Sequence, residues 1–102
     1  MSETGNGEAI PYEVIMSGST KALLKRLQAK AIQQGRGHQF LTAFRQIAAQ
    51  LKSDPLTFGE PLYRLPALEL QVRQTGIIPI VLEYAVHEQQ NLVFIRGIRI
   101  MS

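Results

Sequence analysis

The chain has 102 residues, of which 45% are hydrophobic and 19% are charged, and its net charge is +3. This length accommodates one domain, and the composition is that of a globular protein, which argues against intrinsic disorder. Because there is no cysteine, disulfides, thiol catalysis and cysteine-ligated metal sites are excluded. The longest apolar run, residues 77–82, is too short to span a bilayer, and the N-terminus lacks the regions of a signal peptide. The sequence therefore predicts a cytoplasmic protein.

Positive charge is concentrated in one part of the chain. From Ser17 to Ser53 there are seven lysines and arginines and no acidic residue, so all eight acids lie outside this stretch. Such a local excess attracts phosphate groups or an acidic protein. The alternative is a solvated helix surface without a partner, and the sequence leaves both interpretations open.

The N-terminal part is predicted to hold a tail and a first strand. Residues 1–10 are polar and contain glycine, so we expect a flexible tail, followed by a single domain over residues 11–102. Apolar side chains alternate over residues 12–16, which predicts a half-buried strand.

Two helices are predicted next. The first covers residues 20–34, follows residues that can cap a helix, and ends at Gly35 and Gly37. The second covers residues 39–52 and carries an apolar stripe at steps of three and four, formed by Phe40, Leu41, Phe44, Ile47, Ala48 and Leu51. Asp54–Pro55 ends it, because the residue before proline resists the helical conformation. The short link between the helices predicts an antiparallel helical hairpin.

Strands are predicted in the second half of the chain. Residues 56–61 form a loop, and a further short strand over residues 62–65 is uncertain. Alternation over residues 68–74 predicts a strand with one solvent-exposed and one buried face, followed by a tight turn at Gly76. A central strand is expected over residues 77–86. A polar turn over residues 87–91 then leads to a last strand over residues 92–100. Pro79 implies a bulge or a position near the start of the central strand.

The predicted element order is β-α-α-β-β-β. A run of helices followed by a run of strands is typical of the α+β class. We therefore expect a twisted antiparallel sheet with the N-terminal helical hairpin packed on one face.

Several short motifs carry a family resemblance. The basic helical hairpin is followed by an L-x-x-D-P helix end at Leu51–Pro55 and by F-G-E-P-L-x-x-L over Phe58–Leu65. Later strands carry Val72-Arg73, Tyr84-Ala85-Val86 and Val93-Phe94-Ile95. In this order and spacing, the chain from residue 12 to residue 100 resembles the RelE/ParE toxin superfamily, which includes plasmid stabilisation proteins.

The resemblance implies a toxin-like component of a bacterial type II toxin–antitoxin system. RelE-like members enter the ribosome and cut mRNA, ParE-like members inhibit DNA gyrase, and each is silenced by an antitoxin that wraps its surface. For this chain the implied partners are an antitoxin protein and either ribosome-bound mRNA or DNA gyrase. No cofactor, metal or membrane partner is expected, and a homodimer is left open.

The resemblance also places two candidate catalytic residues on the sheet. Arg73 matches a family arginine on the strand before the glycine turn, and Tyr84 matches the last tyrosine of the family pattern Tyr-Arg-x-x-Tyr. The second family arginine is replaced by Val81, and the further catalytic residue that often follows the last strand in the family is expected to be missing. Metal-free RNA cleavage needs an activated 2′-hydroxyl and a group that stabilises charge on the phosphate. Arg73 suits only the second task, so the expected ribonuclease site is degenerate.

Alternation along the strands suggests where the arginines point. Arg73 alternates with Leu70 and Val72, so we expect it on the open face of the sheet, as a phosphate-binding or a solvated arginine. If the last strand is regular, Arg96 and Arg99 face opposite sides of it. One of them would then lie beside Arg73 on the same face, and the other would protect a sheet edge against aggregation.

The candidate residues for binding nucleic acid or an acidic antitoxin are Lys21, Lys25, Arg26 and Lys30 of the first helix, together with Arg96 and Arg99 of the last strand. No aromatic platform for stacking single strands lies nearby. His38 and His87 are expected in loops without metal-ligand partners. Tyr63 and Tyr84 are expected to pack with their hydroxyls in water.

Three functions follow from these features. The leading hypothesis is a toxin-like growth inhibitor with a degenerate ribonuclease site. The alternative is a non-toxic module that keeps the fold and binds one acidic protein partner. The third is a dedicated mRNA endoribonuclease, in which Arg73→Ala would abolish cleavage of ribosome-bound message.

Overall fold

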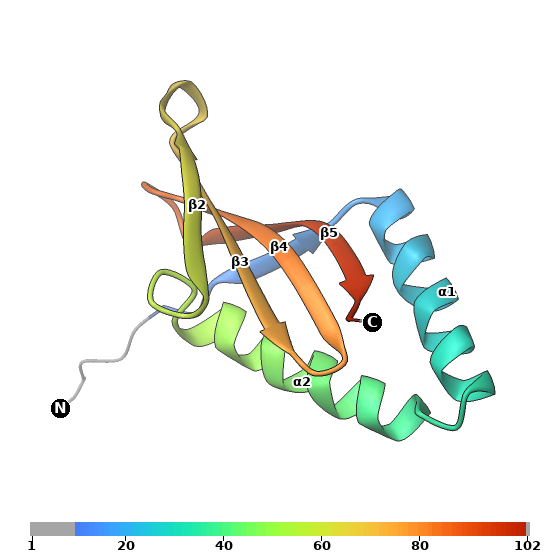
Figure 1. Ribbon diagram of the computed structural model, residues 1–102. Coiled ribbons are helices and arrows are strands. Elements are labelled where there is room, and N and C mark those ends of the chain that lie inside the picture. The colour runs from blue at the N-terminus through green and yellow to red at the C-terminus, as the bar shows by residue number, and fades with distance from the viewer. Residues whose placement is uncertain (1–9, 102) are drawn as a thin grey trace, which may run out of the picture.

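The computed structural model describes residues 10–101, which form two α-helices and five strands (Figure 1). The expected flexible tail over residues 1–10 lies, apart from Ile10, outside the described residues. The elements follow in the order β1 (Glu13–Met16), α1 (Gly18–Gln33), α2 (Gly37–Ser53), β2 (Glu60–Leu65), the short 3-10 helix η1 (Pro66–Leu68), β3 (Leu70–Ile77), β4 (Ile80–His87) and β5 (Leu92–Ile100). No helix within residues 10–101 is long and apolar enough to cross a membrane.

The strands form one sheet in the order β1-β5-β4-β3-β2. β1 runs parallel to β5, while the other neighbouring strands are antiparallel. The α+β class is confirmed, but the sheet is mixed rather than antiparallel. It has five strands and not four, because the uncertain strand forms as β2. Parallel neighbours need a long connection, and here it comprises both helices and three strands.

The helices cover one face of the sheet. The buried side of α2 carries Phe40, Ala43, Ile47 and Leu51, which confirms the predicted amphipathic stripe. They share one hydrophobic core with alternate residues of β4, namely Ile80, Leu82, Tyr84 and Val86. α1 lies against β5, whereas α2 lies against β1, β3 and β4. The two helices also contact each other, but in Figure 1 they diverge from their short link and do not lie side by side as the predicted antiparallel hairpin would.

The helix ends follow from local sequence. Ser17 caps α1, since its hydroxyl accepts a hydrogen bond from the Thr20 N–H at 3.2 Å. α1 ends before Gly35, whose φ of 73° lies in the left-handed region that favours glycine. α2 begins at Gly37, which places His38 in the first turn of a helix and not in a loop.

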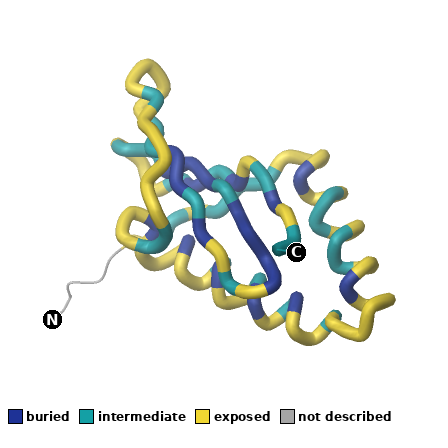
Figure 2. The backbone as a smooth tube through the Cα atoms, viewed as in Figure 1, coloured by how far each residue is buried: buried dark blue, intermediate teal, exposed yellow. Residues whose placement is uncertain are grey.

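β3 and β4 form a hairpin next to the centre of the sheet. β3 continues through Gly76 to Ile77, and the turn consists of Ile78 and Pro79, so the turn predicted at Gly76 is wrong. Pro79 lies immediately before β4, as predicted, and the bond that precedes it is cis. Figure 2 shows β4 buried along most of its length, as expected of a central strand.

β2 is an exposed edge of the sheet, as Figure 2 shows. Its backbone is a poor template for a further strand. Pro61 lacks an N–H, the register with β3 shifts between Pro61 and Tyr63, and Arg64 forms an ion pair with Glu88. Proline, bulges and charge are common protections of sheet edges. The predicted edge role for an arginine of the last strand is wrong, because β5 lies between β1 and β4.

Candidate functional site

Arg73 lies on the helix-covered face of the sheet. It pairs with Tyr84 across β3 and β4, and directly paired residues project to the same side. Tyr84 is fully buried in the core beneath α2, so Arg73 also points toward that core, and only 7% of it is exposed. Its predicted position on the open face is therefore wrong. Val72 occupies that opposite face instead, where it is buried beside Ala85.

Arg73 and Tyr84 hold the loop between α2 and β2 by its carbonyl groups. Arg73 donates from Nε to the Phe58 carbonyl and from Nη2 to the Gly59 carbonyl, each at 3.2 Å. The Tyr84 hydroxyl lies 2.9 Å from the Pro55 carbonyl oxygen and also contacts that of Phe58. We call these interactions the loop clasp. The prediction that the Tyr84 hydroxyl is exposed to solvent is wrong, because this hydroxyl is buried and donates a hydrogen bond to a backbone carbonyl.

The sequence of the loop explains why it needs this support. Pro55 is buried directly after α2, and a buried carbonyl without a donor costs about 1–3 kcal/mol. The Thr57 hydroxyl donates to the Asp54 carboxylate within the loop. Gly59 adopts a φ of 76°, and a Cβ there would lie 2.6 Å from the Gln74 carbonyl oxygen. The geometry of the loop therefore explains why the family-like motifs carry Asp54-Pro55 and Phe58-Gly59 at these positions.

The loop clasp is a structural arrangement. The nitrogens of Arg73 donate to backbone carbonyls, whereas a catalytic arginine must reach the phosphate of a substrate. Burial raises the pKa of Tyr84, which keeps the phenol neutral and unsuited to act as a base. The catalytic roles of Arg73 and Tyr84 stay predictions from the resemblance, and their placement does not favour them.

Alkaline unfolding should report on Tyr84. Its folded-state pKa is raised by burial, while Arg73 acts in the opposite direction. The neutral phenol thus stabilises the fold fully below about pH 10, and this contribution is lost as the pH rises above the ordinary tyrosine value. We expect urea unfolding at about pH 9 and about pH 11 to show a larger loss of stability in the native chain than in Tyr84→Phe. Equal losses in both proteins would contradict the role of Tyr84.

Arg96 and Arg99 lie together on the face that the helices leave uncovered. The register between β4 and β5 shifts at Arg96, and this bulge turns its side chain toward Glu83, 3.7 Å away. Arg99 pairs with Val81, which alternates with the core residues of β4. The last strand is therefore not regular, so the condition for the two arginines to face opposite sides is not met. Neither joins Arg73, which lies on the other face.

An apolar row crosses the uncovered face. Its members are consecutive partners on all five strands, namely Ile15, Phe94, Ala85, Val72 and Tyr63. Val72 and Ala85 are buried, whereas Tyr63 is 49% exposed and its hydroxyl accepts a hydrogen bond from Arg96 at 3.3 Å. The solvent-exposed hydroxyl expected of Tyr63 is confirmed.

The two histidines lie in different elements. The His87 Nδ1 accepts hydrogen bonds from the N–H groups of Gln89 at 3.0 Å and Gln90 at 3.1 Å, so it shapes the turn after β4 as expected. His38 is exposed on α2. Among residues 10–101, no three His, Asp or Glu side chains gather as metal ligands would.

The four predicted binding residues of α1 are all exposed, and we call them the α1 cations, Lys21, Lys25, Arg26 and Lys30. Lys21 and Lys25 lie one helical turn apart, as do Arg26 and Lys30. The two positive charges within each pair repel each other. The first turn of α1 contains no acidic residue, although the positive end of the helix dipole favours one there. Within residues 10–101, no carboxylate forms an ion pair with any of the four.

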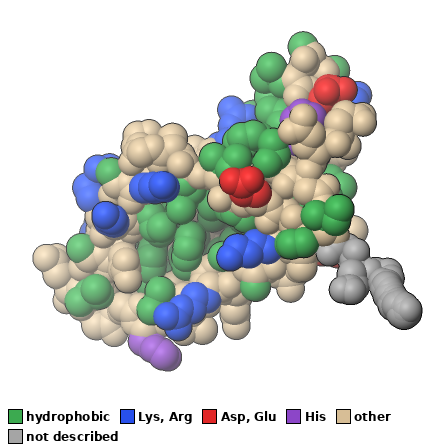
Figure 3. All heavy atoms as spheres, turned by 180° about the vertical axis from the view of Figure 1, so that it is seen from behind, with side chains coloured by type: hydrophobic (Ala, Val, Ile, Leu, Met, Phe, Trp, Pro, Cys, Tyr) green, Lys and Arg blue, Asp and Glu red, His purple; other side chains and the backbone are tan. Residues whose placement is uncertain are grey.

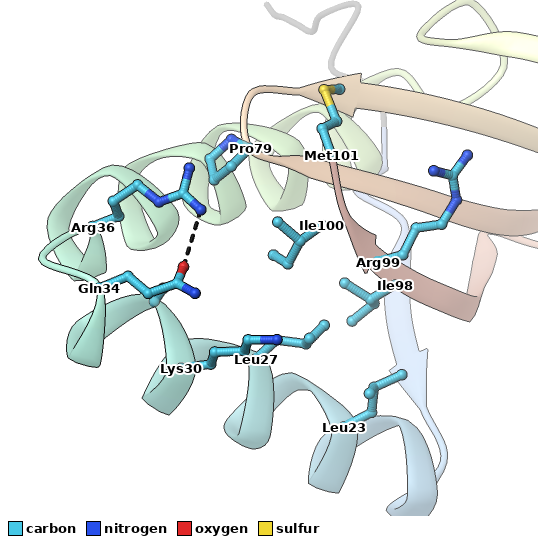
Figure 4. A pocket seen from close by; sticks show the side chains of 11 residues that line it. Leu23, Leu27, Lys30, Gln34, Arg36, Pro79, Ile98, Arg99, Ile100 and Met101 are labelled. Carbon is cyan, nitrogen blue, oxygen red and sulfur yellow. Dashed lines mark hydrogen bonds between the residues drawn. The ribbon is translucent and has the colours of Figure 1, made fainter.

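A cavity of about 520 Å³ lies between α1 and β5, and the sequence did not predict it. Leu23 and Leu27 of α1 face Ile98 and Ile100 of β5 across this α1–β5 cavity (Figure 4). Periodicity cannot separate such lining residues from core residues, because both are apolar and regularly spaced. Seen from behind in Figure 3, hydrophobic side chains lie in a hollow with lysine and arginine side chains around it.

No protein-family model, curated protein or solved structure matches the chain. The fold defines an α+β domain with two helices and a five-stranded mixed sheet. Membership of the RelE/ParE superfamily stays a proposal that rests on the motifs of the sequence.

Proposed function

We propose that the chain is a non-enzymatic module that binds an acidic protein partner through the α1 cations. One observation carries the proposal. The loop clasp uses both residues to which the resemblance assigns catalysis, whereas the α1 cations are exposed and have no ion-pair partner within residues 10–101. The α1 surface is therefore available to a partner, which supports binding over catalysis on the sheet.

Electrostatics favours an acidic partner on α1. Each like-charged pair one turn apart costs the helix about 0.2–0.5 kcal/mol. Carboxylates of a partner would convert this repulsion into attraction and would accelerate association at low salt. α1 contains no aromatic residue on which bases could stack, which favours a protein over single-stranded nucleic acid.

Charge reversal on α1 tests the proposal. The chain is co-expressed with the product of its neighbouring gene, as the most direct candidate partner, and the complex is measured by co-purification and titration. We expect Lys21→Glu with Lys25→Glu to weaken the complex by about tenfold, since each exposed ion pair contributes about 0.2–1 kcal/mol and reversal adds repulsion.

The matched control is Arg45→Glu with Lys52→Glu, which changes the charge equally on α2. We expect this control to keep most of the affinity. Equal weakening by both double variants would mean that net charge, and not the surface of α1, governs association. Absence of a complex with the native chain would remove the main support for this partner.

A toxin-like growth inhibitor of the RelE/ParE type is the second candidate. The order of motifs from residue 12 to residue 100 supports it, with ribosome-bound mRNA or DNA gyrase as the target. Expression of the chain alone in a bacterial host separates the two candidates. The binding module predicts normal growth and intact mRNA with soluble protein present, whereas growth arrest that an antitoxin relieves would establish the toxin.

A further inference from the structure

The α1–β5 cavity is apolar in the middle and basic at one end. Figure 4 shows Leu23 and Leu27 opposite Ile98 and Ile100. The end near the link between the helices is formed by Lys30, Gln34 and Arg36. Arg36 donates from Nη2 to the Gln34 Oε1 at 3.0 Å, which orients its guanidinium. The side chain of Arg99 points away from the cavity in Figure 4, so it does not add to this basic end.

Among the described residues, 10–101, no acidic side chain lines the α1–β5 cavity. Within residues 10–101, neither Lys30 nor Arg36 forms an ion pair. Ala31 and Ile98 are each 6% exposed, so part of the lining is close to fully buried. An apolar wall that ends in two unneutralised cations is complementary to a molecule with an apolar body and an anionic head.

The volume of the cavity indicates the size of its occupant. About 520 Å³ lies within the range of roughly 300–1,000 Å³ that is usual for small-molecule sites. A helix with its side chains is about 10–12 Å across and rises about 5.4 Å per turn, so a helical segment would fit for only about one turn. The size therefore favours a small ligand over a helix of a partner protein.

We propose that the α1–β5 cavity binds a small amphiphilic anion, of the class of alkyl carboxylates. Its tail lies between the leucines of α1 and the isoleucines of β5. Its carboxylate accepts charge-assisted hydrogen bonds from Lys30 and from Arg36, whose planar guanidinium matches a carboxylate. The site is separate from the outer surface of α1 and shares only Lys30 with the α1 cations.

Decanoate is the probe, and decyltrimethylammonium is the control with the same tail and the opposite charge. Titrations of the labelled native chain are followed by NMR and calorimetry. We expect saturable one-to-one binding of decanoate, with the largest shifts at Leu23, Leu27, Ile98 and Ile100. The cationic control should bind at least about tenfold more weakly, because it cannot accept the charge-assisted hydrogen bonds and is repelled by both cations. Absence of saturable binding, or equal binding of both probes, overturns the proposal.

A pair of variants locates the anionic head. Arg36→Glu should weaken decanoate binding at least about tenfold, whereas Lys25→Glu, an equal charge change on the outer side of α1, should leave it unchanged. Arg36→Gln repeats the test without reversing the charge. Equal effects of Arg36→Glu and Lys25→Glu, or shifts confined to other surfaces, overturn the site. The double variant Lys21→Glu with Lys25→Glu is expected to weaken only the complex with a protein partner. Failure of the proposed binding of an acidic protein is therefore distinguishable from failure of the proposed ligand site.

Discussion

Gly59→Ala is expected to lower the free energy of unfolding by about 3 kcal/mol, because the added methyl group meets backbone and not a movable side chain. The Cβ would lie 2.6 Å from the Gln74 carbonyl oxygen and 3.1 Å from the Tyr84 hydroxyl oxygen. The φ of 76° adds a cost that any residue with a side chain would carry. Urea unfolding, monitored by circular dichroism, measures the difference.

Gly97→Ala is the matched control for this substitution. Gly97 lies on β5, and a Cβ at this position meets nothing within 4 Å. We expect a change of no more than about 0.5 kcal/mol, which is usual for surface substitutions. If the two alanine variants had equal stability, the tight approach of the loop to β3 would be refuted.

Arg73→Ala is expected to lower the free energy of unfolding by about 2–3 kcal/mol, since hydrogen bonds made by a charged group contribute about 1.5–3 kcal/mol. The substitution removes both of the arginine's bonds to the loop and leaves the carbonyls of Phe58 and Gly59 without these donors. Proteolysis should then cleave the loop between α2 and β2 more readily, because its ends are no longer held.

Arg99→Ala provides the comparison, because Arg99 is an exposed arginine of the same sheet. Its effect on stability should stay within about 0.5 kcal/mol. A catalytic role of Arg73 would give a different result. If Arg73→Ala kept full stability but abolished an RNA-cleaving activity of the native chain, the loop clasp would not be the main role of Arg73.

Elements with a strong local pattern were predictable. The apolar stripe of α2 identified the helix and its buried side, and the continuous apolar run of β4 identified a central strand that is buried along most of its length. The pairing of β1 with β5 was not predictable, because it joins residues that are distant in the sequence. The tight turn was misplaced at Gly76 because glycine is a common turn signal, although Ile78–Pro79 provides the turn here.

The orientation of Arg73 shows why the candidate site was harder to predict. Alternation on β3 assigns Val72 and Arg73 to different faces, but it does not say which face the helices cover. Both residues are buried, so the apolar residue alone does not identify the core side. The deciding fact is the pairing of Arg73 with Tyr84, which register fixes and local sequence does not. The α1 cations were predictable because their exposure follows from helical spacing.

The parallel pairing of β1 with β5 has a consequence for synthesis of the protein. Glu13 pairs with Leu92, so the first strand finds its partner only after almost the whole described chain has left the ribosome. Contacts that distant in sequence form slowly, and until they form both strand edges are free to pair with other chains. A nascent chain halted before β5 would hold α2 above an incomplete sheet, and such a fragment should require a chaperone or be degraded.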